Sequence, residues 1–565
     1  MCSSDLTPGG IQHDSARLGP LGDRVESGPA GSAGLIAVER SLGTCGGSDR
    51  DVLVVGGGIH GAAVAWVATL AGLKVGLVER GDFAGATSAQ SQKIIHGGLR
   101  YLQDLDIRRS LQSIRDRARL FRIAPHLAHP LACLIPLEGY GMRGPEVMRA
   151  GLLLYRVLSA MEPCPEDPSK RLPHPGVLPA AKLRSLIGGV PAGNARGAAV
   201  WSDGCVHHTE RLVVGLIRSA CRAGATAANY AEAVSTLKHD GRVCGIEVED
   251  RLGGGRTEHL APWTVDCSGP WEGCLTVLPG RSHRRRVGGL NLVTRPIHPQ
   301  PVAVGVRDRS GDGSRFYFVS PWRGGSIVGT EWFRHEAAPE EFRPTEERIA
   351  RMLAGFNRAW PAAGLRRADI LHVHCGTVPA DDRAWDRGED APMLAHSRVI
   401  DRAADGLPGL ISVVGVKYTT ALSVAEEVVR RIRPGFRLSP AGELPQLAGG
   451  AIPDWAAFER EGRAAGIAED LLRDYGTEAA AVAGDGRGDV GAMVRHAVEH
   501  EMAVRLEDVV FRRTGLAARG RPDDRVIREA AGAMAARLQW DEARTAAEIG
   551  AVESTPAWPG AASGR

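Results

Sequence analysis

Apolar and polar residues follow one another in blocks that predict a strand, a helix and a second strand. An apolar run begins after Asp51 and ends at Gly56, and an apolar, alanine-rich segment extends from Ala62 to Leu73. A second apolar run, from Lys74 to Val78, ends at Glu79. Short apolar runs that end in turn residues are typical of buried strands, whereas the longer segment suits a helix. We therefore expect a βαβ unit here.

The turn after the first predicted strand has the spacing Gly-x-Gly-x-x-Gly, with glycines at Gly56, Gly58 and Gly61. In this motif the first glycine permits a tight turn, and the second lets backbone N–H groups approach a pyrophosphate. The third lets the helix lie close to the sheet, and the helix N-terminus favours the negative charge of the phosphates. Glu79 lies 23 residues after Gly56, where a carboxylate can accept the hydroxyl groups of an adenosine ribose. The segment therefore predicts a dinucleotide site; the alternative is an ordinary glycine-rich turn.

Two further predicted strands also end in glycine turns, one at Ser268–Trp271 and one at Gly415. Helices are predicted at 104–128, 147–161, 209–224 and from Lys417 to about Ile432, and strands at 226–237, 242–249, 258–267 and 410–414. The segment 286–335 is β-rich, and the chain is mostly helical after 454. One nucleotide site is thus assembled from segments near 56, 269 and 415. A discontinuous nucleotide domain interrupted by a β-rich substrate domain is typical of flavoproteins.

These predictions define an α/β fold: a discontinuous Rossmann-like FAD-binding domain, an inserted β-rich substrate domain and an α-helical C-terminal domain. The FAD-dependent oxidoreductase region is predicted to span 50–435, with FAD-binding segments at 50–130, 190–285 and 370–435 and substrate-domain segments at 131–189 and 286–369. A Pro/Gly-rich linker at 436–453 precedes the helical domain, 454–553. The polar segments 1–49 and 554–565 are expected to be a disordered extension and tail.

Length and composition narrow the class of protein. A chain of 565 residues is too long for one core, so two or three domains are expected. A net charge of +3 is too small to indicate a nucleic-acid partner. None of the ten cysteines forms a Cys-x-x-Cys pair, which favours reduced thiols in a cytoplasmic protein and argues against a dithiol reductase. We expect no metal site, no transmembrane helix and no signal peptide.

The apolar segment 147–161 is either a packed helix or a contact with a membrane surface.

The run from Phe83 to Leu102 contains Ile-His-Gly-Gly-Leu-Arg-Tyr, and it resembles the signature of FAD-dependent glycerol-3-phosphate dehydrogenases. Further segments match counterparts in that family, which belongs to the D-amino-acid-oxidase-like flavoproteins: Ser268–Trp271, Ser320–Trp322, Val328–Thr330, Lys417–Thr420, Tyr475–Thr477, His500–Ala503, Leu506–Val509 and Arg512–Thr514. The resemblance implies an enzyme that oxidises sn-glycerol 3-phosphate to dihydroxyacetone phosphate with FAD and a quinone acceptor. It also implies a homodimer and peripheral contact with the inner face of the cell membrane.

Candidate catalytic residues carry cations or a hydroxyl group. Arg100 can bind phosphate oxygens in a bidentate fork, and the resemblance places a substrate-site arginine there; the alternative is a surface arginine at a helix start. Tyr101 either donates a hydrogen bond or packs. Lys417 follows a strand-terminal turn, where its cation would face the developing negative charge of a reduced flavin. The resemblance also assigns a substrate contact to Arg398.

Candidate FAD-binding residues surround the glycine turns. His96 precedes Gly97 and Gly98, which suggest backbone passing close to the flavin with N–H groups facing it; His96 itself is either structural or in contact with the cofactor. Three hydroxyl residues follow the second predicted strand: Thr87, Ser88 and Ser91. They are either ligands for the pyrophosphate or the flavin edge, or simple loop caps. The resemblance completes the FAD-binding set with Ile59, Arg80, Leu99, Val234, Ser268, Gly269, Gly415, Lys417 and Thr419.

The sequence departs from the family pattern around the substrate. Asn291 stands where the family usually has histidine, and an amide is no base near neutral pH. Val378 replaces an arginine. Other changes are at Glu331, Trp332, Val416, Ala421 and Leu422. Three interpretations stay open: a glycerol-3-phosphate dehydrogenase, a related flavin oxidoreductase acting on another hydroxy or amino compound, and a flavin-binding regulatory or assembly protein. The catalytic base is not identified at this stage.

Overall fold

The computed structural model describes residues 40–41, 50–139, 144–162, 164–189, 195–271, 273, 275, 285–308, 315–484 and 488–555. The predicted disordered segments therefore lie outside the described residues, apart from Arg40, Ser41 and the positions next to each boundary. The described cysteines are free thiols, at positions 133, 164, 205, 221, 244, 267 and 375. Among the described helices, none combines the length and apolarity needed to cross a bilayer.

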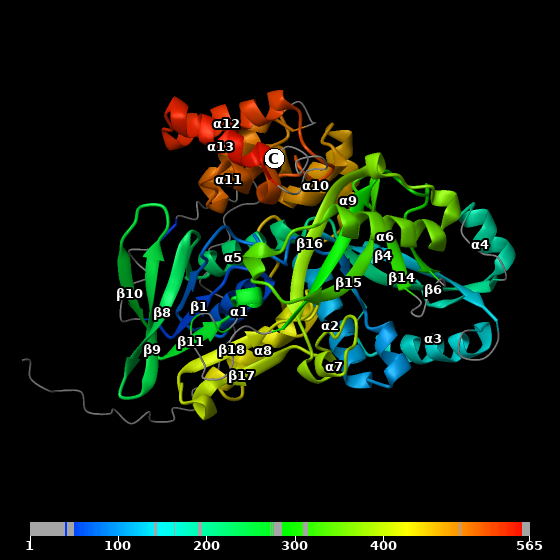
Figure 1. The fold of residues 1–565 in the computed structure, drawn as a ribbon, viewed down its shortest axis with the longest axis horizontal. Coiled ribbons are helices and arrows are strands. Elements are labelled where there is room, and N and C mark those ends of the chain that lie inside the picture. The colour runs from blue at the N-terminus through cyan, green and yellow to red at the C-terminus, as the bar shows by residue number, and fades with distance from the viewer. Residues whose placement is uncertain are drawn as a thin grey trace, which may run out of the picture. The chain divides into compact units, whose positions relative to one another are not determined.

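A six-stranded sheet within the described residues forms the centre of the nucleotide half, in the order β17-β18-β11-β1-β2-β7. Its strands are β1 (Val52–Val55), β2 (Val75–Val78), β7 (Thr226–Ala228), β11 (Trp263–Asp266), β17 (Arg398–Asp401) and β18 (Leu410–Val414). All neighbours pair in parallel except β17 and β18. The strands come from three distant segments, as predicted for a discontinuous domain, and Figure 1 shows them side by side.

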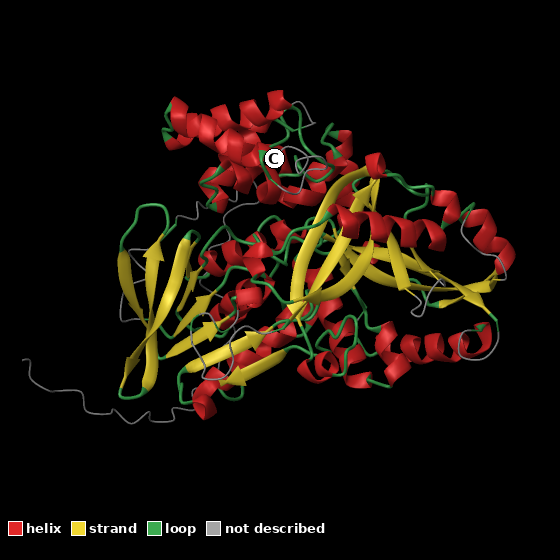
Figure 2. Ribbon diagram, in the orientation of Figure 1, coloured by secondary structure: helices red, strands yellow, loops and turns green. Residues whose placement is uncertain are grey.

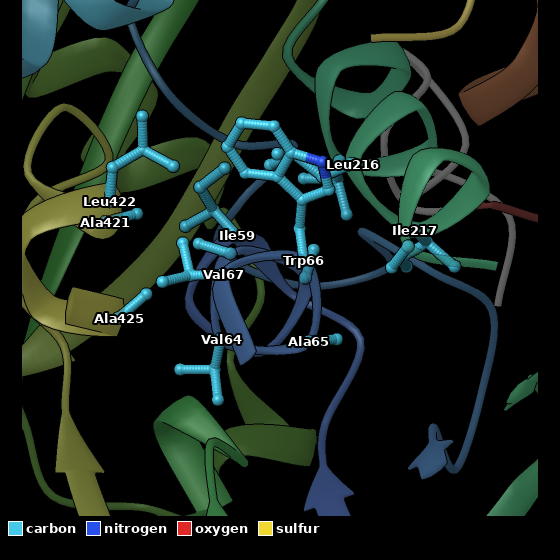
Figure 3. Packing of buried hydrophobic residues seen from close by; sticks show 14 of the residues in the cluster. Ile59, Val64, Ala65, Trp66, Val67, Leu216, Ile217, Ala421, Leu422 and Ala425 are labelled. Carbon is cyan, nitrogen blue, oxygen red and sulfur yellow. The ribbon is translucent and has the colours of Figure 1, made fainter. Parts of the chain in front are cut away.

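Three helices cover this sheet: α1 (Ile59–Leu70), α5 (Thr209–Arg222) and α8 (Ala421–Ile432). Trp66 of α1 is 2% exposed and lies between Leu216 of α5 and Leu422 of α8 (Figure 3). Burial of a large aromatic side chain of this kind contributes about 1.5–3 kcal/mol relative to leaving it exposed. This packing fixes the N-terminus of α1 against the glycine turn.

A nine-stranded mixed sheet forms the second layer, and a three-stranded antiparallel sheet extends from the nucleotide half (Figure 2). The larger sheet contains β3 (Ile94–Ile95), β4 (Ala128–Glu138), β5 (Gly176–Pro179), β6 (Ala195–Val206), β12 (Arg286–Thr294), β13 (Val302–Asp308), β14 (Arg315–Trp322), β15 (Gly325–His335) and β16 (Ile370–Pro379). The smaller contains β8 (Ala231–His239), β9 (Arg242–Asp250) and β10 (Arg256–Leu260). Strands β6 and β16 belong to the larger sheet, although both fall within ranges predicted for the FAD-binding domain.

The other helices are α2 (Ile107–Ile123), α3 (Pro145–Ser159), α4 (Ala180–Leu186), α6 (Glu346–Ala359), α7 (Asp382–Asp386), α9 (Trp455–Ala464), α10 (Glu469–Tyr475), α11 (Val490–Glu501), α12 (Asp524–Leu538) and α13 (Glu542–Glu553). A π-helical segment, η12, spans Asp508–Arg513. The C-terminal helical domain is confirmed. The predicted linker 436–453 is packed rather than extended, because Leu444 and Leu447 are buried and the Leu447 N–H donates to the Ile123 carbonyl.

Several predicted boundaries are wrong for local reasons. The strand predicted at 226–237 is two strands in different sheets, because Tyr230 takes a left-handed conformation (φ 52°) between them. The strand predicted at 258–267 is likewise two, interrupted next to Pro262, which has no N–H to donate. The helix predicted at 104–128 starts later, because Asp106 caps it by accepting the Arg109 N–H.

Helix α3 corresponds to the apolar segment predicted at 147–161, and it has apolar residues on two faces. Leu152 and Tyr155 are buried in the protein. Leu153 and Val157 are 62% and 57% exposed. The packed-helix interpretation therefore accounts for one face and leaves the other open to solvent.

Candidate active site

A cavity of about 2920 Å³ lies at the carboxyl ends of β1, β2, β11 and β18 and extends to the inner face of the nine-stranded sheet. Sites for single small ligands are roughly 300–1,000 Å³, so this cavity has room for a dinucleotide together with a substrate. Its position outside the carboxyl ends of parallel strands is where open α/β sheets bind nucleotides.

The glycine turn has the geometry that the sequence predicts. Gly56 has φ +106°, and a Cβ there would lie 2.5 Å from the Cys267 carbonyl oxygen. A Cβ on Gly61 would lie 1.8 Å from the Gly56 oxygen, so helix α1 approaches the turn more closely than any other residue allows. Gly58 precedes α1 and lines the cavity together with Gly56 and Ile59. Gly61 itself does not line the cavity; its role is to permit this approach.

Glu79 lies at the end of β2 and lines the cavity. Its carboxylate accepts the N–H of Gly57 at 2.6 Å and the N–H of Gly81 at 2.8 Å. Burial raises the pKa of Glu79, and these two backbone donors partly offset that rise. Two oxygens offer about four lone-pair sites, so the carboxylate keeps acceptor capacity for ribose hydroxyls.

The three predicted hydroxyl ligands all line the cavity, and each also makes a hydrogen bond within the protein. Thr87 donates to the Thr377 carbonyl, Ser88 accepts the Ile59 N–H at 2.9 Å, and Ser91 accepts the Lys93 N–H. Only the bond between Ser91 and Lys93 is a local loop cap, since Thr87 and Ser88 bond to residues far away along the chain. Because the oxygens of Ser88 and Ser91 act as acceptors, their O–H groups remain available to donate to a ligand.

A group of cations surrounds Tyr101 on one wall of the cavity. The Lys417 Nζ lies 3.5 Å from the centroid of the Tyr101 ring, and the Arg109 guanidinium carbon lies 4.0 Å from it. The Lys417 Nζ is buried and has no hydrogen-bond partner within the described structure. Burial, with a smaller contribution from Arg100, lowers the pKa of Lys417 to about 7. An ammonium group without a partner that lines a cavity indicates an anionic ligand.

His96 lies on another part of the cavity wall, where it pairs with a buried carboxylate. Its Nδ1 lies 2.9 Å from Asp203 Oδ2, and its side chain is 51% exposed. Burial raises the pKa of Asp203, but the hydrogen bond and charge of His96 lower it, and the net shift of the Asp203 pKa is downward. In neutral histidine with Nδ1–H donating to Asp203, Nε2 carries a lone pair.

The prediction for Gly97 is wrong in its orientation. Its N–H donates to Asp203 Oδ1 at 2.8 Å and so does not face a flavin. A Cβ there would lie 1.9 Å from an Arg117 nitrogen and 2.1 Å from the Tyr155 oxygen. Gly97 is therefore required by packing beside the His96–Asp203 pair, whereas Gly98 and Leu99 line the cavity.

Two other predicted residues stay outside the cavity. Arg398 is exposed on the edge strand β17 and does not line the cavity, although antiparallel pairing sets it opposite Val414, next to the turn at Gly415. Val234 is absent from the lining, although its neighbour Ala233 lines it. The other predicted residues that line the cavity are Arg80, Arg100, Ser268, Gly269, Gly415 and Thr419.

Most of the altered positions also line the cavity, whereas Ala421 and Leu422 are buried in the core. Asn291 is 3% exposed; its Oδ1 accepts the Thr330 hydroxyl at 2.7 Å, and its Nδ2 points to the Gln90 carbonyl. Val378 lies on β16 and presents an apolar side chain to the cavity. The replacements at the usual histidine and arginine positions, Asn291 and Val378, are thus both at the cavity surface.

Sequence reasoning missed Arg109, Asp203 and Arg512. Arg109 lies on α2, which was interpreted from its apolar face alone, and Asp203 comes from β6, far away along the chain. Arg512 and its neighbour Glu507 line the cavity from the C-terminal domain. The adjacent arginines Arg512 and Arg513 were the one feature of the sequence that could have indicated a site residue in this domain.

The residues present fit FAD. The turn that only glycine can form matches the pyrophosphate, and the Glu79 carboxylate at the end of β2 matches the adenosine ribose. The buried Lys417 ammonium, which has no hydrogen-bond partner in the described part of the chain, matches an electron-rich flavin.

Comparisons with known proteins agree with this geometry. A family described as FAD dependent oxidoreductase matches residues 51–431, and one described as C-terminal domain of alpha-glycerophosphate oxidase matches residues 445–545. Glycerol-3-phosphate dehydrogenase of Synechocystis sp. is 30% identical over 505 residues, which cover 83% of this chain and 89% of that protein. Aerobic glycerol-3-phosphate dehydrogenase of Escherichia coli is 29% identical over 493 residues, covering 82% and 93%.

Solved structures share the fold. Glycerol-3-phosphate dehydrogenase from Bacillus halodurans, complexed with FAD, superimposes with a TM-score of 0.69 at 23% identity, covering 91% of this chain and 96% of that one. L-alpha-glycerophosphate oxidase from Mycoplasma pneumoniae, with FAD bound, gives a TM-score of 0.50 at 19% identity, covering 69% and 96%.

Proposed function

This chain belongs to the FAD-dependent glycerol-3-phosphate dehydrogenase family, and we propose that it oxidises sn-glycerol 3-phosphate to dihydroxyacetone phosphate and passes the electrons to a quinone. The observation that carries the proposal is the buried Lys417 ammonium, which finds no hydrogen-bond partner among the described residues and lies against Tyr101, close to Arg100 and Arg109. A cavity wall with three cations fits a substrate that carries a phosphate dianion.

FAD is the family's cofactor. Three features of the cavity would hold it: the turn that contains Gly56 and Gly58, the Glu79 carboxylate and the wall around Lys417. When bound, FAD accepts a hydride equivalent from the carbon whose hydroxyl group is oxidised. The glycine turn and the N-terminus of α1 favour the pyrophosphate. Glu79 accepts ribose hydroxyls, and Lys417 stabilises negative charge on the electron-rich ring system.

His96 is the candidate proton acceptor for the substrate hydroxyl. Asp203 holds Nδ1 and so directs the Nε2 lone pair of the neutral ring away from itself. A proton accepted at Nε2 would leave the ring hydrogen-bonded to the Asp203 carboxylate, which Arg117 also approaches at 3.5 Å. Asn291, at the usual histidine position, has no basic atom and can only orient a substrate through hydrogen bonds.

Arg100 would bind the phosphate group. Arg100 is exposed and lines the cavity. The Arg109 guanidinium, 4.0 Å from the centroid of the Tyr101 ring, adds positive charge to the same wall. A guanidinium binds phosphate oxygens through two parallel N–H donors, which also fixes the orientation of the substrate carbon chain.

A second candidate function rests on Asn291 and Val378. These residues remove a base and a cation from the cavity surface, and loss of a phosphate partner costs on the order of 2–5 kcal/mol. The alternative is a flavin oxidoreductase that acts on another hydroxy or amino compound. Here, FAD binds normally but sn-glycerol 3-phosphate is a poor substrate.

A substrate panel distinguishes these functions. Turnover is followed with a soluble quinone analogue, using sn-glycerol 3-phosphate, glycerol, short 2-hydroxy acids and small amino acids. The proposed function predicts that sn-glycerol 3-phosphate has the highest kcat/KM and that dihydroxyacetone phosphate is the product. Higher kcat/KM for a compound without a phosphate would establish the alternative.

We also propose a cytoplasmic location with peripheral contact at the inner face of the cell membrane, and a homodimer. The exposed residues Leu153 and Val157 of α3 support the contact, since apolar side chains on an amphipathic helix favour an interface with lipid. Flotation with vesicles, compared between the protein and a Leu153→Glu variant, tests the contact. Analytical ultracentrifugation tests the dimer.

A further inference from the structure

The loop after β2 has a cavity side and a C-terminal-domain side. Glu79 and Asp82 both line the cavity, and the Asp82 carboxylate, three residues later, is also paired with the C-terminal domain. Arg513 makes a two-pronged ion pair with it: one nitrogen lies 2.6 Å from Oδ1 and another 2.8 Å from Oδ2. Arg512 donates to Oδ2 as well. Two arginines of η12 thus hold the loop that carries the ribose acceptor.

A second connection joins the same two parts of the protein. Asp508 of η12 accepts the Tyr230 hydroxyl at 2.6 Å and an Arg512 nitrogen at 2.7 Å. The Tyr230 N–H donates to the Gly81 carbonyl, and the next N–H along the chain donates to the Glu79 carbonyl, both at 2.7 Å. The backbone carbonyls of Glu79 and Gly81 are therefore tied to Tyr230 and the residue that follows it, and η12 fixes Tyr230.

The ion pair is built to hold the loop rigidly. The Arg513 side chain is fully buried, the Asp82 side chain is 1% exposed, and two further donors complete the network, since Arg513 Nε donates to the Glu501 carbonyl and Asn229 donates to Asp82. Burial alone would raise the pKa of Asp82, but the guanidinium groups of Arg513 and Arg512 lower it below its usual value. The carboxylate therefore stays charged and paired near neutral pH.

We propose that the C-terminal helical domain is part of the FAD-binding machinery: Arg513 and Arg512 are positioning residues that, through Asp82, hold Glu79 in place for the adenosine ribose. Arg512 and Glu507 also line the cavity, so the domain contributes side chains to its wall directly as well. This role concerns the cofactor and does not depend on which substrate is oxidised.

The test compares FAD with FMN, which lacks the adenosine half, on full-length protein from which FAD has been reversibly removed. Asp82→Asn replaces the clamped carboxylate by its neutral isostere. FAD affinity should fall about tenfold, the lower end of what loss of a supporting residue costs in metal sites. FMN affinity should not change, because Glu79 acts on the part that FMN lacks. Equal losses for both flavins, or no loss for FAD, would overturn the proposal.

Glu478→Gln is the matched control. Glu478 also belongs to the C-terminal domain and forms a two-pronged buried pair, with Arg218 at 2.7 and 2.9 Å, but it does not line the cavity. Both variants should lower the melting temperature, and only Asp82→Asn should weaken FAD. If Glu478→Gln weakens FAD equally, docking in general is responsible and the proposal fails.

Arg512→Gln is the second variant if Asp82→Asn does not fold. It leaves the Arg513–Asp82 pair in place while removing the hydrogen bonds from Arg512 to Asp82 and Asp508. The expected result is a several-fold loss of FAD affinity with FMN unchanged. Unchanged FAD affinity in this variant would contradict the proposal.

Discussion

The Lys417 ammonium lies 3.5 Å from the centroid of the Tyr101 ring, which joins the turn after β18 to the Ile-His-Gly-Gly-Leu-Arg-Tyr segment. A cation over an aromatic face keeps part of its stabilisation without a hydrogen bond. The contact therefore leaves the ammonium available to a ligand while it fixes the direction of the side chain.

Removal of this cation should slow flavin reduction. In Lys417→Met, the rate constant for anaerobic reduction should fall about 100-fold, since a group that stabilises developing charge in a closed site contributes on this scale. Stopped-flow absorbance measures it. Lys417→Arg keeps the charge and serves as the control, with a smaller loss. An unchanged rate in Lys417→Met would show that the cation has no part in the reaction.

Anion binding should depend on pH in the window around pH 7. Burial lowers the pKa of Lys417 to about 7. The side chain therefore carries its positive charge below that pH and loses the charge as pH rises through it. Sulfate, which does not titrate in this range, should bind more weakly at pH 8 than at pH 6, as read from the flavin spectrum. In Lys417→Met the difference should disappear. Tighter binding at pH 8 would contradict the assignment.

His96 and Asp203 should act as a unit. His96→Gln should lower kcat by about 10²–10⁴, the usual contribution of a general base, without loss of bound FAD. Asp203→Asn should lower kcat less, because the histidine keeps its basic nitrogen but loses its partner. If both variants retain wild-type kcat and its pH profile, the hydroxyl proton goes elsewhere.

Val378→Arg should restore a cation at the altered wall. If the substrate phosphate lies there, KM for sn-glycerol 3-phosphate should fall at least about tenfold, which corresponds to about 1.4 kcal/mol. Val378→Gln, similar in reach but uncharged, controls for size. A higher KM in Val378→Arg alone would favour a substrate without phosphate.

Gly61→Ala should weaken FAD binding and stability together. The added Cβ would meet the Gly56 oxygen at 1.8 Å, so α1 must move away from the turn. Overpacking of this kind costs about 1–3 kcal/mol or more. Thermal unfolding with and without FAD measures it. Gly532→Ala, which meets nothing within 4 Å in a C-terminal helix, should leave FAD binding unchanged and raise stability by about 0.5–1 kcal/mol, since alanine is the better helix former.

The sequence predicted those parts of the site that depend on local order. The βαβ unit, the glycine turn, Glu79 and the cavity positions of Arg100 and Lys417 follow from patterns within short segments. The orientation of the Gly97 N–H could not be predicted, because its partner Asp203 lies 106 residues further along the chain, on β6, which pairs with β3 only in the folded sheet. Boundaries failed where one residue changed the backbone, as at Tyr230.

The pairing of η12 with the nucleotide loop was equally out of reach. Asp82 and Arg513 are buried only because two domains meet, and neither residue has a local pattern that names its partner. Charged side chains are read as solvent-exposed by default, so a buried network of this kind becomes visible only in the folded chain.

Anaerobic reduction of the bound flavin by sn-glycerol 3-phosphate tests the central claim most directly. The purified protein is loaded with FAD, the substrate is added without oxygen, and the oxidised flavin band is followed. The proposed function predicts rapid and complete bleaching, with dihydroxyacetone phosphate formed in equal amount to FAD. A properly loaded flavin that stays oxidised would contradict it and would direct attention to the other hydroxy and amino compounds of the panel.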